Sequence, residues 1–124
     1  MKKIVSIFWV FTSMCGNTAF AEVETDAAKL AQTINYLLAF VENSECKFIR
    51  NDKEHSAENA AAHMRKKYQY FKDKIKTPED FIRLAATKSL ITNKPYLVRL
   101  KNGKLVKSET WLLQALDVFQ KEPN

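Results

Sequence analysis

The sequence predicts an α+β domain, with about four helices packed on one side of a small antiparallel sheet. Four segments of the chain repeat apolar residues at the spacing of a helix, each behind residues that favour a helix start. Two short alternating segments flank Asn102-Gly103, which is the pattern of a β-hairpin at residues 96–107. A hairpin alone is only marginally stable, so a third strand is expected at residues 46–50.

The first 21 residues have the pattern of a secretory signal peptide. Two lysines after Met1 give a positive start, residues 4–14 are apolar, and Ala19-Phe20-Ala21 is a small-residue cleavage motif. We expect cleavage after Ala21 and one mature α+β domain over residues 22–124. The apolar stretch is shorter than the roughly 20 residues of a membrane span. No later stretch reaches that length, so no transmembrane span is expected after cleavage.

Charge and glycine content restrict the function classes. The net charge is +6, and removal of Lys2 and Lys3 would lower it to +4. This mild excess favours anionic partners, but no dense basic stripe points to nucleic acid, which is therefore not expected as a partner. Only Gly16 and Gly103 are present. This excludes a Walker A loop, a dinucleotide fingerprint and a nucleophile elbow, and no cofactor is expected.

The first helix is predicted from Thr25 or Asp26, either of which can cap it, to about Glu42. One apolar stripe follows the helical spacing and consists of Leu30, Ile34, Leu37, Leu38 and Val41. Residues 46–50 then form the short strand, and Asn51-Asp52 turns the chain.

The second helix is predicted from Ser56 to about Ile75. Steps of three and four residues place its buried stripe at Ala57, Ala60, Ala61, Met64, Tyr68, Phe71 and Ile75. A rotation of 100° per residue places His63 and Lys67 together on one polar flank of this stripe. We interpret this flank as a basic, solvated helix face. The alternative is a surface that binds an anionic or sugar ligand.

Two further helices are predicted in the second half of the chain. One begins at Thr77-Pro78-Glu79-Asp80, where threonine caps the helix, proline takes the first position and acidic residues meet the helix dipole. It is expected to end near Lys88. The last helix opens at Ser108, and its buried face consists of Trp111, Leu112, Ala115, Leu116 and Phe119.

The hairpin between these helices has a predicted register. Asn102-Gly103 indicates a two-residue type I′ turn, because both positions of that turn need a positive φ. This register pairs Lys101 with Lys104 and Leu100 with Leu105. The face that points toward the core then carries Tyr96, Val98, Leu100 and Leu105.

One cysteine, Cys46, remains in the mature chain, because Cys15 lies in the predicted signal peptide. Buried packing is the main expectation for Cys46, and a disulfide with another chain or a functional thiol are the alternatives. Cys46, His55 and His63 lack the spacing of metal ligands, so no metal site is expected. No motif supports a Cys46–His63 nucleophile pair, and no catalytic residue is assigned.

Several short motifs occur in order along nearly the whole mature chain. They are Phe48-Ile49-Arg50-Asn51, His63-Met64-Arg65, Lys67-Tyr68, Thr77-Pro78-Glu79-Asp80-Phe81-Ile82, Ala86-Thr87-Lys88-Ser89, Lys94-Pro95-Tyr96 and Trp111-Leu112. As an ordered set they resemble the YfeK-like family of small exported bacterial proteins of unknown function. Asp52 stands where this family often has glycine, and Thr92-Asn93 where it often has Ser-Gly. The resemblance implies periplasmic localisation and no established activity.

The resemblance also indicates which polar residues belong to the family pattern: Arg50, Asn51, His63, Lys67, Thr87, Ser89 and Tyr96. We expect them to converge in one binding cluster; the alternative is that they cap helix ends and join elements through hydrogen bonds. The predicted function is a non-enzymatic binding or interaction module for an envelope protein or an anionic cell-wall or lipid component. The alternative is a small envelope hydrolase or transferase with His63 as general base.

Overall fold

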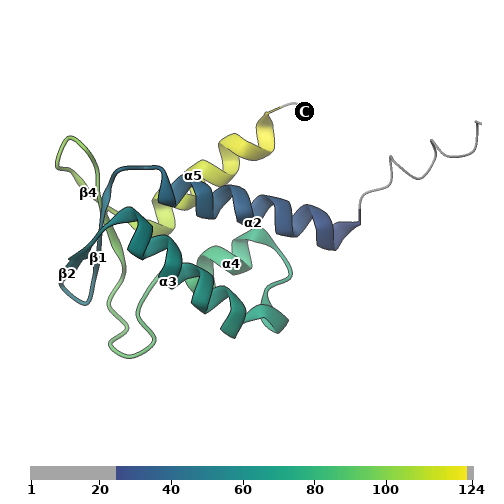
Figure 1. Ribbon diagram of the computed structural model, residues 1–124, viewed down its shortest axis with the longest axis horizontal. Coiled ribbons are helices and arrows are strands. Elements are labelled where there is room, and N and C mark those ends of the chain that lie inside the picture. Colours follow the sequence, from purple (N-terminus) through teal and green to yellow (C-terminus); the bar gives the residue numbers. More distant parts are fainter. Residues whose placement is uncertain (1–24, 123–124) are drawn as a thin grey trace, which may run out of the picture.

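The computed structural model describes residues 25–122, so the predicted signal peptide and its cleavage site lie outside the described residues. The fold is α+β, as predicted, with the four helices gathered on one side of a four-stranded antiparallel sheet (Figure 1). The helices are α2 (Asp26–Glu42), α3 (Ala57–Tyr70), α4 (Pro78–Ala85) and α5 (Ser108–Lys121). The strands are β1 (Lys47–Arg50), β2 (Lys53–His55), β3 (Leu97–Arg99) and β4 (Leu105–Lys107). No helix within residues 25–122 is long and apolar enough to cross a membrane.

The sheet brings together segments that are distant in the sequence. Its strand order is β2-β1-β3-β4, so β1 and β3 are neighbours although α3 and α4 separate them along the chain. Phe48 of β1 lies opposite Val98 of β3, and both side chains are buried. The helices cover the face that carries Phe48 and Val98. Successive residues of a strand point to opposite faces, and Lys47 and Arg99 on the other face are exposed.

The core lies where α2 packs against α3, α4 and α5. Its fully buried large side chains include Ile34 and Leu37 of α2, Phe81 of α4 and Leu112 of α5. The predicted helix starts are confirmed. Thr25, Ser56 and Thr77 each accept a hydrogen bond from the backbone N–H three residues later, at 3.0–3.1 Å.

Two helices are shorter than the sequence predicted. α3 ends at Tyr70, and a short 3-10 helix, η2 (Lys72–Lys74), carries the chain on to the buried Ile75. α4 ends at Ala85 rather than near Lys88. The hydroxyl of Thr87 donates to the carbonyl of Ile82 at 2.8 Å, which offers the backbone an alternative to another helical turn.

The predicted register of the β3–β4 hairpin is wrong by one residue. Arg99 pairs with Leu105, which leaves a three-residue loop, 101–103, between Leu100 and Lys104. Only Gly103 in this loop has a positive φ, of 90°, as expected for a type I turn followed by a bulge. Leu105 therefore points away from the core and is 46% exposed, while Val106 packs against the core.

The type I′ geometry occurs instead in the first hairpin, which contains the unpredicted strand β2. Arg50 pairs with Lys53, and the two loop residues Asn51 and Asp52 have φ values of 52° and 68°. Both positions of a type I′ turn need a positive φ, and Asn and Asp adopt this region more readily than other non-glycine residues. Asp52 therefore takes the backbone conformation that glycine would favour.

Candidate functional site

A pocket of about 310 Å³ opens between β1, α3 and the loop of residues 86–96 that joins α4 to β3. The lining side chains are those of Arg50, Asn51, His63, Lys67, Ser89, Leu90, Ile91 and Tyr96. We call this the cationic pocket, because the described residues that line it include two strong bases and no acidic residue. The structure thus brings together six of the residues predicted from the sequence. Thr87, the seventh, does not line the pocket.

Lys67 forms the buried end of the pocket. Its side chain is only 7% exposed, so the interpretation of its flank as a solvated helix face is wrong at this position. The ammonium donates to the carbonyl of Lys88 at 3.0 Å and to the hydroxyl of Tyr96 at 3.1 Å. Burial, together with the charge of Arg50, lowers the pKa of Lys67 to about 8. Lys67 is therefore a buried cation that is still mainly charged at pH 7.

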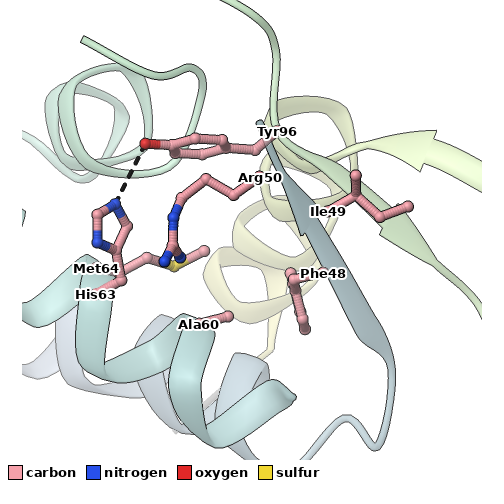
Figure 2. Close-up of a pocket in the computed structure, with 7 residues that line it drawn as sticks. All are labelled: Phe48, Ile49, Arg50, Ala60, His63, Met64 and Tyr96. Carbon is pink, nitrogen blue, oxygen red and sulfur yellow. Dashed lines mark hydrogen bonds between the residues drawn. The ribbon is translucent and has the colours of Figure 1, made fainter. Parts of the chain in front are cut away.

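His63 is linked to the same tyrosine. Its Nε2 atom lies 3.3 Å from the hydroxyl of Tyr96 (Figure 2). Burial, then the charges of Arg50 and Lys67, lower the pKa of His63 to about 4, so the imidazole is neutral at pH 7. Burial also raises the pKa of Tyr96. Because the tyrosine oxygen accepts from Lys67, its own proton is free to be donated to the neutral imidazole.

Arg50 supplies the second strong positive charge. It is the last residue of β1, and its side chain points toward α3 and His63 (Figure 2). Of the four arginines in residues 25–122, only Arg50 has no carboxylate partner. The other three form ion pairs at 2.9–3.0 Å, namely Arg65–Glu42, Arg83–Asp80 and Arg99–Glu54. The guanidinium of Arg50 is thus available to an anion.

The loop of residues 86–96 is held over the pocket by hydrogen bonds to the β1–β2 turn. The hydroxyl of Thr92 donates to the side-chain oxygen of Asn51 at 2.5 Å, and the ammonium of Lys94 pairs with the Asp52 carboxylate at 2.6 Å. Within the loop, the Ser89 hydroxyl accepts hydrogen bonds from two backbone N–H groups, at 3.1 and 3.3 Å. Asn51 and Ser89 therefore help to shape the loop as well as line the pocket.

A much smaller cavity adjoins the cationic pocket on the side of the sheet. It measures about 10 Å³ and is lined by Phe48, Ile49, Arg50, Ala60, His63, Met64 and Tyr96 (Figure 2). A cavity of this size holds about one water molecule. Of these two adjoining spaces, only the cationic pocket has room for a ligand.

The described residues do not form the contacts that nucleophilic catalysis or metal binding would need. Cys46 is buried, its thiol lies 3.7 Å from the carbonyl of Ser44, and it does not line the pocket. Among the residues that the structure describes, the only hydroxyl in hydrogen-bond contact with His63 is that of Tyr96, and Ser89 is not a partner. Among residues 25–122, no three His, Cys, Asp or Glu side chains gather as they would around a metal ion.

Sequence reasoning missed two lining residues, Leu90 and Ile91, which are 61% and 91% exposed. They are adjacent aliphatic residues placed between Ser89 and the turn-forming Thr92-Asn93, outside any helix or strand pattern. That position is the only signal in the sequence that they are displayed rather than buried.

Comparisons with known proteins place the chain in a family. A family model described as "Family of unknown function (DUF5329)" matches residues 28–120, which include every residue that lines the cationic pocket. The chain is 34% identical over 97 residues to "Uncharacterized protein YfeK" of Salmonella typhimurium, and the match covers 77% of each chain. No solved structure matches. The protein belongs to the YfeK-like family of unknown function, DUF5329.

Proposed function

We propose that the protein is an exported, periplasmic, non-enzymatic binding protein whose cationic pocket holds an anionic ligand of the cell envelope. The observation that carries this proposal is the pair Arg50 and Lys67, two positive charges that line one pocket without an acidic residue. A buried or half-buried cation normally has a carboxylate partner, and an uncompensated one is costly to the folded protein. An external anion would supply the missing charge.

The hydrogen-bond donors of the pocket support the same ligand class. The ammonium of Lys67 has three donors, of which the described residues use two. The guanidinium of Arg50 offers five donors in a planar fork that suits a carboxylate or phosphate. Hydrogen bonds of this charged kind are about twice as strong as neutral ones, so they favour an anionic ligand over a neutral one.

The enzymatic alternative, with His63 as general base, has less support. A general base works best when its pKa is near the working pH, and the pKa of His63 is about 4. Its hydrogen-bond partner is the Tyr96 phenol, and no serine or thiol of the described part of the chain is in contact with it. His63 is better suited to hold Tyr96 in position beside Lys67.

Substitution of Arg50 tests the anion site directly. Arg50→Gln is expected to weaken binding of inorganic phosphate about tenfold, because a charge-assisted contact is lost. The measurement is a chemical-shift titration of the mature protein at constant ionic strength. The matched control is Arg99→Gln, on the neighbouring strand, whose guanidinium already pairs with Glu54. Equal binding by both variants would contradict the proposed site.

Export is tested with the full-length chain carrying a carboxyl-terminal tag in a Gram-negative bacterium. We expect osmotic shock to release a product whose intact mass corresponds to a chain that begins at Glu22. The control variant, Ala19→Arg with Ala21→Arg, replaces the small residues of the cleavage motif, so it should keep its leader. An uncleaved wild-type chain in the cytoplasmic fraction would refute the proposed location.

A further inference from the structure

We propose that the ligand is a small amphiphilic anion: a carboxylate or phosphate group that carries a short aliphatic chain. Arg50 and Lys67 hold the charged group, and the aliphatic chain lies against Leu90 and Ile91. This inference rests on the proposed function, because it names the class of anion that the cationic pocket takes.

The two aliphatic side chains line the same pocket as the two cations. Leu90 and Ile91 are 61% and 91% exposed, although both are large apolar residues in a well-defined loop. The loop fixes them there. The hydroxyl of Ser89 accepts from the backbone N–H of Ile91, and the N–H of Asn93 donates to the Ser89 carbonyl at 3.0 Å. The exposed side chains are therefore displayed by a hydrogen-bonded turn at the rim.

The pocket thus has a cationic inner part and an aliphatic rim. A bare anion bound to Arg50 and Lys67 would leave Leu90 and Ile91 in water. An aliphatic chain attached to that anion would cover them and remove apolar surface from water, which is the main favourable term in most association. The volume of about 310 Å³ lies at the lower end of the range for small-molecule pockets, so the chain is expected to be short.

The test is a titration series of acetate, butyrate, hexanoate, hexyl phosphate and hexanol with the mature protein at constant ionic strength. We expect affinity to rise two- to fourfold for each methylene group from acetate to hexanoate, since each buried methylene contributes up to about fourfold. Hexanol, which has the chain without the charge, is expected not to bind. A preference for hexyl phosphate or for hexanoate then separates a phosphate ester from a carboxylate as the source of the charge.

Substitution of the rim separates the aliphatic contact from the anion site. Ile91→Ser is expected to flatten the dependence on chain length and to leave acetate affinity unchanged. The matched control is Val118→Ser, an exposed aliphatic residue of α5 that does not line the pocket. Ile91 is too exposed for its substitution to affect folding.

Three results would overturn parts of this inference. If acetate and hexanoate bind equally well, the aliphatic part is wrong and the anion-binding function stands. If hexanol binds as tightly as hexanoate, the anionic part is wrong. If neither these anions nor inorganic phosphate bind, the proposed function fails together with the inference.

Discussion

Lys67→Met is expected to raise the free energy of unfolding at pH 7 by about 1–2 kcal/mol, because it replaces a buried charge with an apolar side chain of similar length. Lys67 is 7% exposed and has no carboxylate partner within residues 25–122; it donates to the Lys88 carbonyl and the Tyr96 hydroxyl. Loss of these two hydrogen bonds offsets part of the gain. The same variant is expected to weaken phosphate binding at least tenfold, since the inner charge of the pocket is removed.

The pH dependence of this gain in stability tests whether the buried charge of Lys67 is its cause. The pKa of Lys67 is lowered from 10.5 to about 8 in the folded protein, so above pH 8 the unfolded chain holds a proton that the folded chain has released. Wild-type stability relative to the variant therefore rises with pH in this range. The advantage of Lys67→Met should shrink by about 2 kcal/mol between pH 7 and pH 9.5.

Urea denaturation at several pH values measures both effects, and Lys66→Met is the matched control. Lys66 precedes Lys67 on α3 but is exposed, so its substitution should change neither stability nor phosphate affinity strongly. If Lys67→Met instead lowers stability equally at all pH values, Lys67 is a structural hydrogen-bond donor rather than a cation kept for a ligand.

The sequence predicted those parts of the fold that depend on neighbouring residues. Ser56 and Thr77 were predicted as helix caps, and Thr25 was one of two candidates with Asp26; such predictions are possible because capping is a contact between residues three positions apart. The strand β2 was missed because Lys53-Glu54-His55 has no apolar alternation; it is a polar edge strand, and β1 is its only paired strand among residues 25–122. The Asn102-Gly103 pair suits two kinds of hairpin loop, and sequence alone did not decide between them.

The candidate site was only partly predictable, because it depends on contacts between distant segments. Helical spacing placed His63 and Lys67 on one flank of α3, and they do line one pocket. Spacing within a helix says nothing of what covers that flank. The loop of residues 86–96 covers it, with Tyr96 and the Lys88 carbonyl both bonded to Lys67. The burial and the lowered pKa of Lys67 follow from that tertiary contact.

Acid is expected to destabilise the protein through His63, beginning near pH 6.5, before most carboxylates titrate. The pKa of His63 in the folded protein, about 4, lies below the usual value of 6.5. Between these two values, His63 is protonated in the unfolded chain and neutral in the folded chain. Stability is therefore lost as pH falls from about 6.5 toward 4. The full shift corresponds to about 3 kcal/mol, and partial exposure of the imidazole reduces our expectation to about 1–2 kcal/mol.

His63→Gln tests this assignment against His55→Gln. The pKa of His55 is also lowered, by burial and by the charges of Arg50 and Lys53, but His55 lies on the edge strand β2, outside the pocket. Between pH 6.5 and 4.5, His63→Gln should remove most of the loss of stability and His55→Gln little of it. The lowered pKa of Asp80 acts only below this range. An equal effect of the two histidine variants would refute the assignment.

A bound anion should reduce this acid sensitivity, which links His63 to the proposed ligand. After burial, the charges that lower the pKa of His63 are those of Arg50, Lys67, His55 and Lys66. Arg50 and Lys67 have the largest effects among these charges. An anion between them would offset both effects and raise the pKa of His63. Phosphate at a concentration that just saturates the wild type is therefore expected to flatten its stability profile between pH 6.5 and 4.5, and to have a clearly smaller effect in Arg50→Gln at the same concentration. If phosphate stabilises the protein equally at both ends of that range, the anion does not bind beside His63.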